Sequence, residues 1–376
     1  MLSQPPIWLI LLAFICAIGP LVFIHELGHY LVARWFGVGA ETFSIGFGRE
    51  IFGWKDKRGT RWKVGWLPLG GYVRFAGDAD VASAASSSAP VSSDVIGHTF
   101  HDRPVGQRFL IVLAGPMANF ALAILIIAAF FVTVGIPRTP NLVERVVPGS
   151  AAEEAGIRPG DRIVSIDGQG TPTFENLRYV IALRPGAEVP IQVERGSASL
   201  VLKVRLGAQI VRDDFGQSHR IGLLGIPPPK RILIRPGPFE LIPKAVGATL
   251  SMVAMMIDGI IQIVSGYISP KELGGPLKIA QMAGQQASLG AFEFVALIAM
   301  LSINLGFINL LPVPMLDGGH LAFYTIEAVR RRPVGETAQE WAFRGGLAAL
   351  LALLVFVTIN DLSSFGLWER LGRLIG

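Results

Sequence analysis

Residues 7–35 of the chain read IWLILLAFICAIGPLVFIHELGHYLVARW. Two histidines, His25 and His29, stand four positions apart in this run, and Glu26 lies between them. On a helix this spacing places both imidazoles on one face, about one turn apart, where they can bind the same metal ion. A glutamate beside such a pair can act as the base for a water at the metal. The stretch therefore predicts a metal centre on an apolar helix.

The composition places the chain among integral membrane proteins. Of its 376 residues, 51% are hydrophobic and only 16% are charged, whereas about a quarter of the residues in soluble domains are charged. The run at 7–35 is long enough to span about 30 Å of hydrocarbon, and ionisable groups inside such a span are usually functional. The net charge of +5 is modest and its basic residues are spread out, so nucleic-acid binding gains no support.

The distribution of apolar runs predicts an α-helical polytopic membrane protein with about four transmembrane helices. In this prediction it also carries a membrane-associated β-hairpin or sheet and one inserted β-rich domain. We expect transmembrane helices over 1–37, 105–136, 291–330 and 340–365, a β-hairpin region over 38–80, a flexible cytoplasmic linker over 81–104, a β-rich domain over 139–225 and amphipathic membrane-surface helices over 238–290. The last segment differs from a span because Lys244 and Asp258 interrupt its apolar patches.

The hairpin region is rich in Phe, Trp, Val and Gly, with alternation in places and a polar turn at 55–59. Its tryptophans suit the membrane interface. One interpretation is a plain surface hairpin. The sharper one is a sheet edge near the metal that holds a substrate in extended form.

The β-rich domain contains the stretch PGSAAEEAGIRPGDRIVSIDG at 148–168. Ser150 suits the N-cap of a short helix and Gly156 its C-terminal end, while Asp167 and Gly168 favour a hairpin turn after a short strand. This order closely resembles the PDZ domain of bacterial envelope proteases, and we find one copy of it. PDZ domains bind extended peptides by adding a strand to a sheet edge. A small β-rich domain without peptide binding is the alternative.

A second stretch, at 309–320, reads NLLPVPMLDGGH. Its prolines and glycines break a helix, and irregular backbone at membrane depth is tolerated only where it is buried in protein or lines a wet cavity. Catalytic zinc usually has three protein ligands, so Asp317 is the natural partner of His25 and His29. Four histidines compete with it, of which the last is nearest in sequence: His98, His101, His219 and His320. We predict one Zn²⁺ ion on His25, His29 and Asp317, with Glu26 as the catalytic base.

The two stretches resemble the HExxH and NxxPxPxLDG signature motifs of the site-2 protease family, the M50-type intramembrane zinc metalloproteases. The similarity is greatest to the bacterial branch of the regulator of sigma-E protease, whose best-known members carry two PDZ domains where this chain shows one. The resemblance implies an endopeptidase acting on single-span membrane proteins, such as anti-sigma factors, or on signal-peptide remnants. It also implies that Asn309 contacts substrate. PLGGYV at 68–73 matches too, and we predict that Gly70, Gly71 and Tyr72 bind substrate.

The charges predict an orientation in the membrane, which the resemblance implies is the bacterial inner membrane. Because no Lys or Arg precedes Arg34, the positive-inside rule places the N-terminus and the PDZ domain on the periplasmic side and the active site near the cytoplasmic side. The predicted partners are single-pass transmembrane substrates, peptide ends or segments at the PDZ domain, and the lipid bilayer. Two other functions compete: a PDZ-bearing membrane scaffold with a non-catalytic metal site, and a zinc transporter, which would need polar residues across more than one helix.

Overall fold

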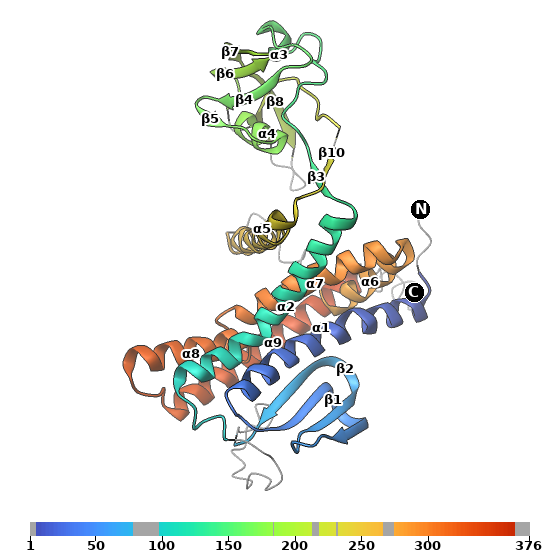
Figure 1. Cartoon of the computed structure of the whole chain (residues 1–376), viewed down its shortest axis with the longest axis vertical. Helices are drawn as coiled ribbons and strands as arrows, with labels where there is room; N and C mark the ends of the chain where they lie inside the picture. The colour runs from blue at the N-terminus through green and yellow to red at the C-terminus, as the bar shows by residue number, and fades with distance from the viewer. Residues whose placement is uncertain are drawn as a thin grey trace, which may run out of the picture. The chain divides into compact units, whose positions relative to one another are not determined.

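A computed structural model describes residues 5–77, 98–182, 184–212, 218–230, 232–265 and 274–364. The chain divides into two compact units (Figure 1). The helical unit comprises Met1–Ala129 and Glu240–Gly376, and the β-rich unit comprises Phe130–Phe239. Most of the predicted linker over 81–104 lies outside the described residues.

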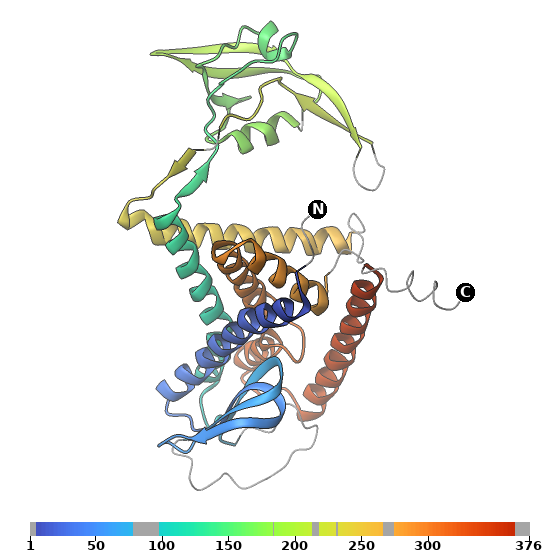
Figure 2. The ribbon, with the colours of Figure 1, turned by 90° about the vertical axis from the view of Figure 1, so that its right-hand side faces the viewer.

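The helical unit is built from long apolar helices and one β-hairpin (Figure 2). Its elements are α1 (Ile7–Trp35), β1 (Ala40–Lys55), β2 (Arg61–Phe75), α2 (Val105–Thr133), α5 (Pro238–Val264), α6 (Pro276–Leu289), α7 (Ala291–Leu310), α8 (Asp317–Arg330) and α9 (Glu336–Ser364). In the described part of the chain, five segments are long and apolar enough to cross a membrane: Ile7–Trp35, Val105–Thr133, Pro238–Ile261, Ala291–Leu310 and Thr337–Ser363. The fold class expected from the sequence, a helical membrane protein with a β domain, is confirmed.

In the part of the chain that the structure describes, the span-capable helices number five, against the four or so predicted from the sequence. The difference is α5, where Lys244 and Asp258 suggested separate surface helices. Instead the segment is one continuous helix, and Lys244 Nζ pairs with Glu240 Oε2 one turn earlier at 2.6 Å. This local pair partly compensates one of the interrupting charges. The position of α5 on the membrane surface stays a prediction.

The metal-motif helix α1 lies tightly against α2. A Cβ atom added at Gly28 would lie less than 3.0 Å from the Ala114 carbonyl and from the Ala118 Cβ. Small residues allow backbones in membrane helices to approach this closely. Farther toward its N-terminus, α1 buries Ala13, Ala17 and Leu21 against residues of α6 and α7. The segment carrying the two histidines is therefore held between several helices.

The hairpin forms a small curled sheet beside α1. Its strands pair twice, because Phe43 of β1 has a cross-strand partner in Trp62 and another in Val73, both on β2. The final segment of β2, Gly71–Phe75, pairs with β1 along one side. In the described residues no strand pairs with its other side, which makes this segment a sheet border. Tyr30 of α1 packs edge-on against Phe43 and Trp62, which fixes the sheet against the helix.

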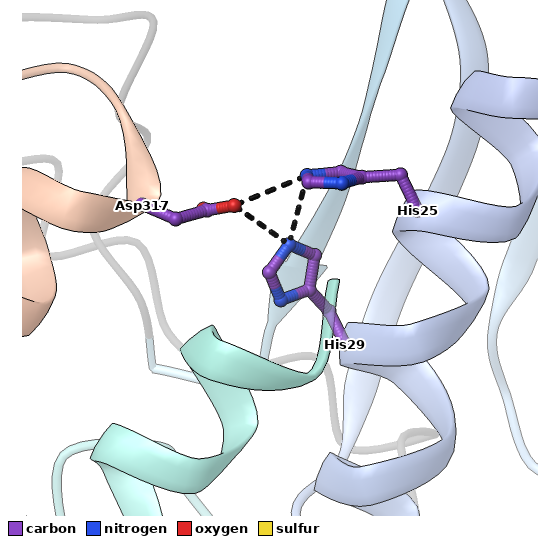
Figure 3. Close-up of side chains that lie close together, drawn as sticks. All are labelled: His25, His29 and Asp317. Carbon is purple, nitrogen blue, oxygen red and sulfur yellow. Dashed lines mark hydrogen bonds and ion pairs between the residues drawn. The ribbon is translucent and has the colours of Figure 1, made fainter. Parts of the chain in front are cut away.

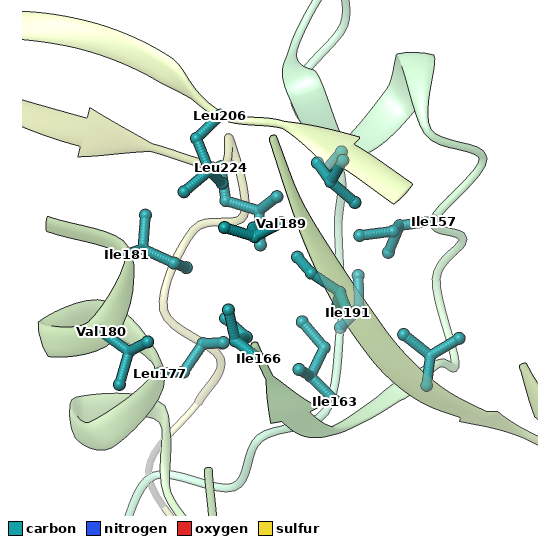
Figure 4. Packing of buried hydrophobic residues seen from close by; sticks show 14 of the residues in the cluster. Ile157, Ile163, Ile166, Leu177, Val180, Ile181, Val189, Ile191, Leu206 and Leu224 are labelled. Atoms are coloured by element: carbon teal, nitrogen blue, oxygen red, sulfur yellow. The ribbon is translucent and has the colours of Figure 1, made fainter. Parts of the chain in front are cut away.

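The β-rich unit has its own hydrophobic core (Figure 4). Its elements are β3 (Ile136–Arg138), α3 (Ala151–Glu154), β4 (Arg162–Ile166), β5 (Gln169–Gly170), α4 (Phe174–Ala182), β6 (Glu188–Arg195), β7 (Ala198–Arg205), β8 (Gly207–Arg212), β9 (Ser218–Leu223) and β10 (Ile232–Ile234). Four strands form one sheet in the order β5-β4-β6-β7. Alternate residues of β6, Val189, Ile191 and Val193, point into the core, as expected for a strand with one buried face.

The local signals read from the sequence of this unit have structural counterparts. The Ser150 side chain accepts a hydrogen bond from the Glu153 N–H and caps α3. Gly156 follows with a φ of +75°. Asp167 and Gly168 both have positive φ and join β4 to β5. The predicted order of short helix, turn, strand and hairpin is therefore present.

We predict that Asp161→Asn destabilises the β-rich unit at neutral pH. The buried Asp161 carboxylate accepts hydrogen bonds from Arg195 Nε at 2.7 Å and from Nη2 at 2.8 Å. Losing such charged bonds costs about 1–3 kcal/mol. That range corresponds to a rise of about 5- to 150-fold in the rate of limited proteolysis within residues 130–239 of the intact chain, when opening is fast.

The same pair predicts a pH dependence. Hydrogen bonding by Arg195 lowers the pKa of Asp161 below its ordinary value. Its stabilising effect is therefore present above the unfolded-state pKa, near 4, and is lost as the pH falls through the lower folded-state pKa. Proteolysis with a protease active at each pH should show wild type and Asp161→Asn converging in strong acid. A constant difference between them over the whole range would contradict the assignment.

Candidate metal centre

Three side chains from two helices converge on one point in the helical unit (Figure 3). His25 and His29 extend from α1, and Asp317 from the first turn of α8. The two Nε2 atoms are 3.3 Å apart, and Asp317 Oδ2 lies 3.1 Å from His25 Nε2 and 3.5 Å from His29 Nε2. These atoms form a nearly equilateral triangle. Asp317 stands 288 positions after His29 in the sequence.

Helix α2 orients both histidine rings. His29 Nδ1 is 2.9 Å from the Ile111 carbonyl oxygen, which can only accept a hydrogen bond. Nδ1 of His29 therefore carries the proton, and the lone pair of Nε2 faces Asp317. His25 Nδ1 lies 3.1 Å from the buried Asn119 amide. In the described residues Asn119 Oδ1 has no hydrogen-bond partner, so turning the amide presents this oxygen to a protonated His25 Nδ1.

The geometry fits a zinc ion. Zinc binds histidine nitrogen and carboxylate oxygen at about 2.0–2.2 Å in a tetrahedral arrangement, which places neighbouring ligand atoms about 3.3 Å apart. The triangle has this size. Asp317 Oδ2 is buried without a hydrogen-bond partner among the described residues. The Nε2 lone pair of His29 faces it, and that of His25 does so when the Asn119 amide is turned. Three electron-rich atoms this close repel one another unless a cation lies between them, and they form the one candidate metal group in the described chain.

Glu26 lies in the same cavity as the three ligand residues. The cavity measures about 640 Å³ and is lined by His25, Glu26, His29 and Asp317. Glu26 is 9% exposed and accepts a hydrogen bond from the Val73 N–H of the border segment of β2. The carboxylate is thus placed between the metal ligands and the sheet.

The structure places the predicted substrate-binding residues around this cavity as well. Asn309 at the end of α7 and Gly70, Gly71 and Tyr72 of β2 all line it. The Tyr72 ring stacks on Phe47, with 6.1 Å between ring centroids.

The competing histidines fall into different places. His320 lines the cavity and packs against the Phe343 ring at 5.0 Å, but it is outside the metal group. His98 and His101 are exposed and outside that group too. The side chain of His219 is outside the described residues.

Two contributors to the site escaped the sequence analysis. The Ile111 carbonyl is a backbone group, so the residue type at this position does not indicate its role. Gly115 lies where an added Cβ would be less than 3.0 Å from three ring atoms of His29. Asn119 also contributes, because its side-chain amide lies 3.1 Å from His25 Nδ1. A polar residue inside an apolar span was the signal for Asn119.

Comparison with known proteins places the chain in a family. The model of peptidase family M50 matches residues 13–353. The chain belongs to peptidase family M50. A protein of Agrobacterium fabrum named "Putative zinc metalloprotease Atu1380" is 44% identical over 357 residues, covering 93% of this chain and 95% of its own length. Metalloprotease MmpA of Caulobacter vibrioides is 35% identical over 393 residues, covering 98% of each chain.

The resemblance seen in the sequence is thereby confirmed: this chain is a zinc metalloprotease of the M50 family and a membrane protein. A solved structure, the PDZ domain of the SdrC-like protein of Listeria monocytogenes, matches 25% of this chain and 93% of that domain at 22% identity and a TM-score of 0.19.

Proposed function

We propose that this M50 peptidase is an intramembrane endopeptidase that cleaves the transmembrane segments of single-span membrane proteins. The observation that carries the proposal is the position of the metal ligands. His25 and His29 lie within a 29-residue apolar helix long enough to span a membrane. Asp317 follows a span-capable helix after a short irregular segment. A catalytic centre on such helices suits a peptide bond at membrane depth better than one in water.

The border segment of β2 supports an extended substrate. A transmembrane helix hides its carbonyl groups in internal hydrogen bonds, so it must be unwound locally before hydrolysis. Gly71–Phe75 pairs with β1 on one side and lies beside Glu26. An unwound substrate segment added as a further strand would regain backbone hydrogen bonds there. Gly70, Gly71, Tyr72 and Asn309 line the cavity it would enter.

The residues divide the chemistry between them. When bound to His25, His29 and Asp317, a single zinc ion polarises the scissile carbonyl and makes a water molecule more acidic. Glu26 takes a proton from the attacking water as the new C–O bond forms. It then gives this proton to the leaving amine nitrogen as the C–N bond breaks. Asn119 and Ile111 keep both histidine rings in the required tautomer.

The β-rich unit is proposed to act as a PDZ domain that screens the outer part of substrates. Its short capped helix, turn and strand order support this role. We place it with the N-terminus on the periplasmic side of the bacterial inner membrane. Arg34 at the end of α1 and Arg330–Arg332 at the end of α8 suit the cytoplasmic side. Anti-sigma-factor-like proteins and signal-peptide remnants are the proposed substrate classes, and family membership favours this enzyme over the scaffold alternative.

A comparison of membrane fragments tests the proposal. Cells with the wild-type chain and cells with Glu26→Gln should be compared by mass spectrometry of their membrane peptides. We expect fragments that end inside single transmembrane segments in the wild type, and the uncut parent proteins in the variant. Differences confined to cuts in soluble regions would rule out intramembrane cleavage while leaving a metalloprotease.

A further inference from the structure

One face of α2 carries every residue of that helix that serves the metal centre. Ile111, Gly115 and Asn119 are spaced four residues apart, which places them along one stripe of a helix. Ile111 holds His29, Gly115 leaves room for its ring, and Asn119 holds His25. Three residues before Ile111 the stripe continues with Arg108.

Arg108 contacts the helix that supplies the third ligand. Its Nη2 lies 2.6 Å from Glu327 Oε1 on α8, across 219 positions of sequence, and the two side chains are only 15% and 20% exposed. The guanidinium carbon is also 5.0 Å from the centre of the Tyr324 ring. Partly buried charged pairs hold their geometry better than exposed ones, because solvent screens them less.

The contacts on α8 share a face with the metal ligand. Tyr324 and Glu327 stand seven and ten positions after Asp317, spacings that return to the same side of a helix. Tyr324 is buried and belongs to the same hydrophobic cluster as Ile111 and Tyr30. Glu327 lies about 15 Å along the axis of α8 from Asp317. The ion pair of Arg108 with Glu327 therefore fixes both the rotation and the tilt of α8.

We infer that Arg108 and Glu327 are positioning residues that dock α8 on α2 and so hold Asp317 at the distance from His25 and His29 that zinc requires. Helix α2 then acts as a common frame for all three ligands. It holds the two histidines directly and the aspartate through α8. The ligand side chains of a metal site must stay within about 0.5 Å of their productive positions. A change in the orientation of α8 that moves Asp317 farther than this would therefore weaken zinc binding.

The test measures zinc affinity of the intact chain in detergent by competition with a chelator. Variants are Arg108→Gln, Glu327→Gln, the neutral double variant and the exchanged pair Arg108→Glu with Glu327→Arg. Loss of outer partners of metal ligands typically lowers affinity 10- to 100-fold, and we expect about 10-fold for each single variant. The exchanged pair should recover part of that loss. Stability of the zinc-free protein is followed in parallel by thermal unfolding.

A matched control comes from α9. Arg344 Nη2 and Glu340 Oε1 are also 2.6 Å apart, but their side chains are 57% and 51% exposed and the pair lies within one helix. Replacing both by Gln should leave zinc affinity unchanged.

The inference is overturned if zinc affinity stays at the wild-type value in the variants while only the melting temperature of the zinc-free protein falls. If a single variant does not fold, the zinc affinity of the neutral double variant tests the inference, because that variant leaves no uncompensated charge. Wild-type zinc binding is measured in the same titration, so failure of the metal site itself is seen separately.

Discussion

Replacing Glu26 by Gln should abolish most peptide-bond cleavage while leaving zinc bound. Glutamine has nearly the shape of glutamate, and its amide oxygen can still accept the hydrogen bond from the Val73 N–H. It cannot take a proton from the attacking water. General acid–base catalysis typically contributes about 10²- to 10⁴-fold, so the rate on a model transmembrane peptide in lipid nanodiscs should fall by that factor.

Zinc content distinguishes this outcome from a damaged site. Elemental analysis should find the same metal content in Glu26→Gln and in the wild type, because His25, His29 and Asp317 are untouched. His29→Ala serves as the contrasting variant and should lose both zinc and activity. Cleavage by Glu26→Gln at the wild-type rate would remove Glu26 from the mechanism.

Gly115→Ala should disrupt the metal centre by displacing the His29 ring. The added methyl would lie less than 3.0 Å from three atoms of the His29 ring. That ring is held on its other sides by the Ile111 carbonyl and by the metal ligands. Relief requires α1 and α2 to separate or His29 to rotate away from Asp317. We expect zinc affinity to fall by about 100-fold, the upper end of effects from groups that orient ligands, and cleavage to fall with it.

Gly106→Ala on the same helix is the matched control. An added Cβ at Gly106 has no atom within 4 Å, so the same chemical change should leave zinc affinity and cleavage at wild-type values. Competition with a chelator measures the affinity, and thermal unfolding of the zinc-free proteins separates a local effect from general destabilisation. Equal zinc affinity in both variants would show that His29 can move without consequence.

The fold class could be predicted from the sequence because its signals are local. An apolar run of 29 residues is a helix that suits a bilayer whatever surrounds it. Ser150, Gly156 and the Asp167–Gly168 turn act through their own backbone positions. The number of span-capable helices was less accessible. In α5, the pairing of Lys244 with Glu240 and the continuity of the helix are not visible in a count of charges.

The curled sheet shows another limit of sequence reasoning. Alternating residues predicted a hairpin, but not that Phe43 pairs with both Trp62 and Val73. Strand register depends on which faces become buried against the rest of the protein. The border position of Gly71–Phe75 next to Glu26 was therefore a hypothesis until the strands were placed against α1.

The sequence alone determined the chemistry offered by the HELGH stretch, because helix geometry places His25 and His29 on one face wherever the helix lies. It also nominated Asp317, as an acidic residue in a broken apolar segment. Only the tertiary structure decided how these groups meet. The Ile111 carbonyl, the room left at Gly115 and the Arg108–Glu327 pair act between helices distant in sequence. The physical reason is that the residue type of a metal ligand can be read from the sequence, whereas the orientation of its side chain depends on packing between helices.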